Sequence, residues 1–141
     1  MQSAIDRFRQ DAIVTASPAQ LLTMLYDRLL LDLGRGEKAL EKGDRQEAHR
    51  QLTHAQDIIA ELMSSLKMDV WEGAQQLMAL YVFAMKQLVN ANVSGDPALV
   101  KEIHELFAPL CDAWHQAAAQ LQAGDPTTAT PRRIGGDLGV G

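Results

Sequence analysis

The chain has 141 residues, 47% of them hydrophobic, which fits a single domain with enough apolar side chains for a real core. Its formal net charge of −5 excludes the basic footprint of a nucleic-acid-binding domain and favours a neutral or basic partner. The single cysteine excludes an intrachain disulfide and fits a reducing cytoplasm, and no apolar stretch is long enough to predict membrane insertion.

Residues 1–16 are predicted to form an N-terminal arm ahead of the folded part. Its apolar residues Ile5 and Phe8 are three positions apart, which is compatible with a short helical turn. The arm is either a frayed terminus held by one or two side chains or a movable cap over a binding surface. A strong helix start follows it, because Ser17 suits an N-cap and Pro18 suits the first helical position.

Four helices are predicted, over residues 18–41, 45–66, 70–92 and 97–123. Gly43 is placed to end the first helix, and Asp44, Asp69 and Asp96 are placed to cap the other three. Apolar residues recur at alternating spacings of three and four, and the links between helices are short. The predicted fold is therefore an all-α, antiparallel up-down-up-down four-helix bundle over 17–123. The Gly- and Pro-rich tail, 124–141, is expected to be disordered.

Two predicted helices carry more apolar surface than a bundle core needs. The first has a wide apolar arc, and the third has a wider one, with Phe83 alone on an otherwise polar face. Such a surplus is typical of a protein-binding groove, although exposed Leu and Met also occur in monomers, and the arm or a dimer could cover them. The predicted partner-binding residues are Ile5, Phe8, Leu22, Leu25, Tyr26, Leu29, Leu30, Leu33, Tyr81, Val82, Phe83, Met85 and Val89.

No catalytic, cofactor-binding or metal-binding constellation is evident in the sequence. The histidines lack metal-ligand spacing and are expected on the surface: His49, His54, His104 and His115. Cys111 has no sequence neighbour that marks it as a nucleophile, so a packed thiol is expected. An enzyme is therefore the least favoured class. A helical binding module and a structural oligomerisation or adaptor bundle both remain open.

Four blocks of sequence, in order, resemble the flagellar export chaperone family FliS. The first block includes Thr15-Ala16-Ser17-Pro18 and Met24-Leu25-Tyr26-Asp27, and the others are 55–62, Leu80-Tyr81 and Asp112-Ala113-Trp114. The resemblance covers about residues 8–118 and favours the binding module. It implies a cytoplasmic chaperone that holds the disordered C-terminal segment of flagellin and keeps it from polymerising. It also implies delivery to a component of the flagellar export gate, without a cofactor, and it leaves open a homodimer of the free protein.

The chain departs from the family pattern at several positions. Phe8 stands where the family usually has Tyr, and Arg28 stands where Gly is frequent. The family's Leu-Tyr-Asp-Tyr reads Leu80-Tyr81-Val82-Phe83, so contacts through that Asp and that second Tyr hydroxyl are not carried over. The resemblance further implies that the arm mimics the client, which makes Phe8 a predicted competing cap.

Overall fold

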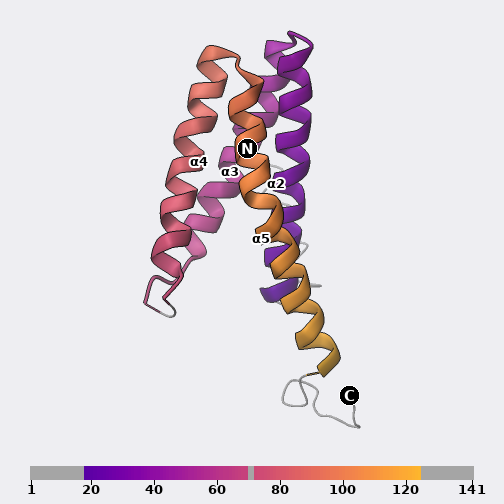
Figure 1. The fold of residues 1–141 in the computed structure, drawn as a ribbon, viewed down its shortest axis with the longest axis vertical. Coiled ribbons are helices and arrows are strands. Elements are labelled where there is room, and N and C mark those ends of the chain that lie inside the picture. The colour runs from indigo at the N-terminus through magenta and orange to yellow at the C-terminus, as the bar shows by residue number, and fades with distance from the viewer. Residues whose placement is uncertain (1–17, 70–71, 125–141) are drawn as a thin grey trace, which may run out of the picture.

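The structure is a computed structural model that describes residues 18–69 and 72–124. Within that part of the chain the regular elements are the helices α2 (Pro18–Glu41), α3 (Arg45–Ser65), α4 (Ala74–Ser94) and α5 (Pro97–Gly124). Each helix packs against the next one, and α5 returns against α2, which closes an antiparallel bundle (Figure 1). The predicted four-helix bundle is confirmed, whereas the predicted arm and the tail beyond Gly124 lie outside the described residues.

The end of α2 follows the sequence prediction. Gly43 has a φ of +79°, the left-handed conformation that glycine adopts without strain. Its N–H donates to the carbonyl oxygen of Leu40 at 3.0 Å, and the N–H of Asp44 donates to that of Ala39 at 2.8 Å. This pair of hydrogen bonds is a Schellman motif, and it reverses the chain into α3.

Two of the predicted N-caps are confirmed. The Asp44 carboxylate accepts a hydrogen bond from the N–H of Glu47 at 3.1 Å, and the Asp96 carboxylate accepts one from the N–H of Ala98 at 2.9 Å. Each bond satisfies a donor that the first turn of a helix leaves free. The predicted cap of α2, Ser17, lies outside the described residues.

The predicted start of the third helix, at Val70 behind an Asp69 cap, is wrong. Helix α4 begins at Ala74, and its N-cap is Gly73, which makes no side-chain capping bond. The carbonyl of Gly73 accepts the N–H of Leu77 at 2.9 Å and so opens the helical ladder. Extending the helix backward through a glycine costs about 1 kcal/mol relative to alanine, which opposes an earlier start.

The other end of α4 is joined to the start of α3. Helix α4 continues to Ser94, past the predicted Asn92, and Gly95 ends it with a φ of +75°. The Arg45 guanidinium donates to the carbonyl oxygens of Asn92 at 2.7 Å and Val93 at 3.2 Å. A cation at the carbonyl end of a helix complements the helix dipole, so this contact fastens α3 to α4.

The core runs along the interior of the bundle. The apolar residues predicted at spacings of three and four form a buried seam on each of two helices: Ala48, Leu52, Ala55, Ile59 and Leu62 on α3, and Ala74, Leu77, Tyr81, Ala84, Leu88 and Ala91 on α4. Leu66, predicted as the last residue of the first seam, is the C-cap of α3 and is partly exposed. Helix α5 adds the fully buried Val100, Ile103 and Phe107. None of the described helices is long and apolar enough to cross a membrane.

Candidate functional site

An apolar groove lies where the starts of α2 and α4 meet the end of α3 and the C-terminal half of α5. Its volume is about 390 Å³. The residues that line it are mostly apolar: Leu22, Leu62, Ser65, Leu66, Lys67, Leu77, Tyr81 and Trp114. A concave apolar surface with few polar groups is typical of a site that takes an apolar side chain or segment.

Two of the lining residues belong to an aromatic cluster that joins α2, α4 and α5. The Tyr26 ring meets Phe107 edge-on at a centroid distance of 5.9 Å and meets Trp114 edge-on at 6.2 Å. Tyr81 stacks on Phe107 at 6.0 Å, and the Tyr26 and Tyr81 hydroxyl oxygens are 2.7 Å apart, a buried hydrogen bond. Edge-on and stacked rings gain free energy beyond their buried area, so this cluster stabilises the packing of α2, α4 and α5 beside the groove.

Burial sets the protonation of this cluster. It raises the pKa of Tyr26 and, together with the neighbouring Tyr26 hydroxyl, raises the pKa of Tyr81 strongly. Both hydroxyls therefore stay neutral at physiological pH, so one donates to the other. Hydrogen bonding from Tyr81 and from Trp114 opposes this rise at Tyr26, and the Trp114 Nε1 atom is itself buried beside the Tyr26 ring.

A second apolar surface, the α4 stripe, lies on the outer side of α4. Val82, Met85, Val89 and Val93 recur at spacings of three and four, so they share one face of the helix. Val82, Val89 and Val93 are 38%, 51% and 79% exposed, and the neighbouring Phe83 is 40% exposed. This amount of exposed apolar surface on one helix indicates a contact with another molecule or segment.

The predicted partner-binding residues fall into three groups in the structure. Ile5 and Phe8 lie outside the described residues. Five are core residues: Leu25, Tyr26, Leu29, Leu33 and Tyr81. The accessible ones are the partly buried Leu22, Leu30 and Met85 and the exposed Val82, Phe83 and Val89. The helical wheel overestimated the free apolar surface of α2, because that helix packs against both α3 and α5.

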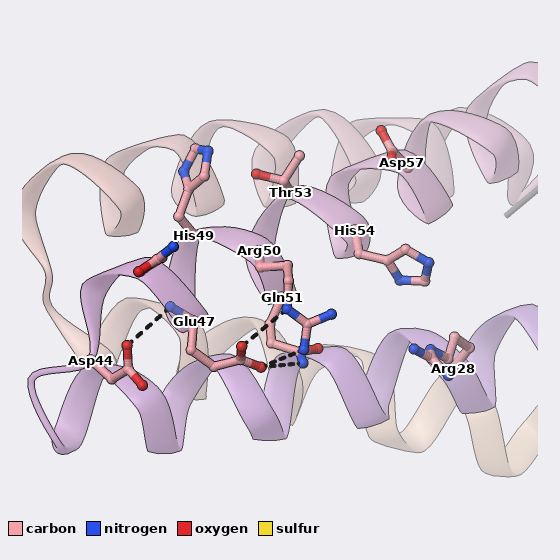
Figure 2. Close-up of a pocket in the computed structure, with 10 residues that line it drawn as sticks. Arg28, Asp44, Glu47, His49, Arg50, Gln51, Thr53, His54 and Asp57 are labelled. Atoms are coloured by element: carbon pink, nitrogen blue, oxygen red, sulfur yellow. Dashed lines mark hydrogen bonds and ion pairs between the residues drawn. The ribbon is translucent and has the colours of Figure 1, made fainter. Parts of the chain in front are cut away.

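A larger depression, about 730 Å³, runs along the polar face of α3. Figure 2 shows Glu47 in it, with its carboxylate directed at Arg50 and Gln51 through hydrogen bonds of 2.7 Å to each. These groups pair within one turn of the helix. The lining residues form no pair of a nucleophile with its base, and they carry charges of both signs. We interpret this depression as a solvated polar face.

A buried carboxylate on α2 is not among the residues singled out from the sequence. Asp32 has no exposed surface, accepts a hydrogen bond from Arg28 Nε at 3.0 Å, and makes a short hydrogen-bond contact with His54 Nδ1. The prediction that His54 is a surface residue is wrong, because its side chain is only 21% exposed and ties α3 to α2. The spacing of Asp32 from Leu25 and Leu29 places it on the core face, a signal that was available in the sequence.

A second polar cluster ties α2 to α5. The Cys111 thiol donates to Asp27 Oδ1 at 3.2 Å, and His115 Nε2 lies 2.7 Å from the same oxygen. Cys111 is buried as predicted, and burial, with the Asp27 carboxylate second, raises the pKa of its thiol to about 12. The thiol is therefore protonated at neutral pH, which does not suit a nucleophile.

Several known proteins resemble this chain over most of its length. A family model described as flagellar protein FliS matches residues 1–121. The flagellar secretion chaperone FliS of Bacillus subtilis strain 168 is 30% identical over 117 residues, which cover 83% of this chain and 87% of that protein. The flagellar secretion chaperone FliS of Escherichia coli K12 is 33% identical over 113 residues, which cover 77% and 81%. A crystal structure of a bacterial flagellar chaperone shares the fold, with a TM-score of 0.67, 22% identity, and coverage of 83% and 96%.

Proposed function

Since the chain belongs to the FliS family of flagellar secretion chaperones, we propose that it binds the C-terminal segment of flagellin in the cytoplasm. Binding would hold that segment apart from other flagellin molecules and so prevent premature polymerisation. The complex would then be presented to a component of the flagellar export gate. Holding and delivery need no catalytic residue and no cofactor of this chain, in keeping with a family of chaperones.

The apolar groove is the observation that carries the proposal. An amphipathic client helix can place apolar anchors in a groove of this kind, with its polar face toward water. The accessible members of the predicted set are proposed to make the contacts: Leu22, Leu30, Val82, Phe83, Met85 and Val89. Of the five buried members, Tyr81 lines the base of the groove, and the other four support these surfaces from beneath, because they hold α2 in the bundle.

Two separate apolar surfaces suit a long client better than a short peptide. A segment that is disordered when free must lose conformational entropy when it binds, and a long interface offsets that loss. The groove and the α4 stripe together offer more apolar area than either alone.

Calorimetric titration with a flagellin C-terminal peptide, at several temperatures, tests the proposal. We expect saturable binding with a negative heat-capacity change, because apolar surface is removed from water. Leu22→Ala in the groove and the double variant Phe83→Ala/Val89→Ala on α4 should each weaken binding by about tenfold or more, roughly 1.4 kcal/mol, without loss of helix content. Leu31→Ala is the matched control, since Leu31 is 42% exposed on α2 and lies outside the proposed contact set. A flat titration at every temperature would refute the proposal.

The α4 stripe also supports the alternative of a structural oligomerisation or adaptor bundle. A second copy of the chain could cover Val82, Val89 and Val93, as apolar surfaces do in symmetric dimers. Light scattering of the free protein, and of the protein mixed with the flagellin peptide, distinguishes the chaperone from the oligomerisation bundle. A dimer that dissociates when the peptide binds fits the chaperone proposal. A stable oligomer that binds no flagellin peptide supports the alternative.

A further inference from the structure

We propose that Asp27, Cys111 and His115 form a binding site for a divalent cation of the zinc class, which would link α2 to α5. One oxygen, one sulfur and one nitrogen ligand atom of these side chains lie within 4.8 Å of one another. The residues belong to neither the apolar groove nor the α4 stripe. The site therefore uses none of the residues proposed to contact flagellin.

The geometry of the three side chains suits tetrahedral coordination. Cys111 and His115 are one helical turn apart on α5, so they present their ligand atoms on the same face, and Asp27 approaches from α2. Asp27 Oδ1 is 3.2 Å from Cys111 Sγ and 2.7 Å from His115 Nε2. Metal–ligand bonds of about 2.0–2.3 Å at tetrahedral angles hold ligand atoms about 3.5 Å apart. Small rotations of the side chains would therefore be enough to admit an ion.

The ligand types select the class of cation. Thiolate, imidazole and carboxylate are the three ligand types that proteins use for zinc, whereas calcium and magnesium prefer oxygen ligands alone. Three protein ligands leave one position open. The side chains of Asp27 and His115 are 55% and 48% exposed, so water can fill that fourth position.

A purely structural role uses the same three residues. Without an ion, the Asp27 carboxylate accepts a hydrogen bond from the Cys111 thiol and contacts His115, which ties the two helices by hydrogen bonding. With an ion, the Cys111 thiol releases its proton to solvent, and its thiolate coordinates the metal together with Asp27 and His115. The two roles differ in their response to added cation, which makes the proposal testable.

Cobalt(II) titration of the untagged, reduced and chelator-treated full chain provides the test. Cys111 is the only cysteine of the sequence, so a thiolate-to-cobalt charge-transfer band can arise at this site alone. We expect the band to saturate at one equivalent, together with the visible bands of tetrahedral cobalt, and to disappear when zinc displaces cobalt. Zinc should also raise the melting temperature, because it binds the folded chain in preference to the unfolded one.

Variants identify the ligands. Cys111→Ser should abolish the charge-transfer band, and His115→Ala and Asp27→Asn should each weaken cobalt binding by about tenfold or more. His49→Ala is the matched control, since His49 is an exposed histidine on α3 outside the cluster. Because His115 is half-exposed, His115→Ala keeps the test valid if Cys111→Ser does not fold. No charge-transfer band at saturating cobalt, an unchanged band in His115→Ala, or a band lost in His49→Ala would overturn the proposal.

Discussion

The hydroxyl groups of Tyr26 and Tyr81 form a buried hydrogen bond in the core, so removing either oxygen atom should change stability. Tyr81→Phe leaves the buried Tyr26 hydroxyl without its partner, which we expect to cost about 1–3 kcal/mol of unfolding free energy. Tyr26→Phe should behave similarly. The double variant should lose less than the sum of the single losses, because neither hydroxyl of the pair is then left without the other. Urea unfolding of the unmodified protein, the two single variants and the double variant measures this coupling. Strictly additive losses of unfolding free energy would contradict it.

The same two residues predict the alkaline behaviour of the protein. They are the only tyrosines of the chain, and the pKa of each is raised in the folded state above the ordinary 10.0. The folded state therefore holds these protons more tightly than the unfolded state does. Their contribution to stability is complete below about pH 10 and is lost as the pH rises above the unfolded pKa.

We therefore expect no tyrosinate absorbance in an alkaline titration until the bundle itself unfolds. Ultraviolet absorbance and far-ultraviolet circular dichroism, recorded on the same samples, should change together. Tyrosinate absorbance near pH 10 with full helix content would show that the hydroxyls are accessible in the folded state.

At the scale of the helix, two glycines of α2 differ in what surrounds them. A Cβ atom added at Gly34 meets nothing within 4 Å, whereas one added at Gly36 lies 2.6 Å from Cδ2 of the fully buried Leu52. Gly34→Ala should stabilise the protein by about 0.5–1 kcal/mol through helix propensity. In Gly36→Ala that gain is opposed by overpacking of about 1–3 kcal/mol, because α3 approaches α2 closely at this residue.

Thermal unfolding of the two glycine variants, side by side, checks the prediction. Gly34→Ala should melt above the unmodified protein, and Gly36→Ala should melt below Gly34→Ala. Equal stabilisation by both substitutions would show that Leu52 moves aside freely.

Helix α4 keeps apolar side chains exposed to solvent even though its inner face is packed in the bundle. Its inner seam is buried, yet Val82, Val89 and Val93 remain exposed on its outer side. Helix α2 has no comparable surplus, because α3 and α5 cover its apolar residues from two sides. Surface for a partner is therefore expected mainly on α4 and at the groove, and less on the middle of α2.

At the scale of the whole molecule, the arm is predicted to compete with the client, although Phe8 lies outside the described residues. If Phe8 occupies a client groove, Phe8→Ala should lower the unfolding free energy by about 1.5–3 kcal/mol through lost burial. Client affinity should rise at the same time, by up to about tenfold per 1.4 kcal/mol, because nothing has to be displaced. Melting temperature and calorimetry of the same variant decide the matter. A variant that is less stable and also binds more weakly would exclude a simple cap.

The sequence by itself determined the features that depend on near neighbours in the chain. The turn at Gly43 and the caps at Asp44 and Asp96 are local hydrogen-bonding arrangements within a few residues, so residue type was enough to predict them. The seams of α3 and α4 follow from periodicity, since residues three and four apart share a helix face. The family assignment also came from ordered blocks of sequence, and the comparisons support it.

Only the tertiary structure decided what depends on how the helices pack. Neighbouring helices determine which apolar residues of α2 are enclosed, so Leu25, Leu29 and Leu33 could not be told from accessible residues by a wheel. Helix α4 begins after Gly73, because glycine has a low helix propensity and the first turn of α4 is buried in the core. The meeting of Asp27 with Cys111 depends on the register of α2 against α5, because the two residues are far apart in sequence and no periodic pattern encodes a pairing between helices.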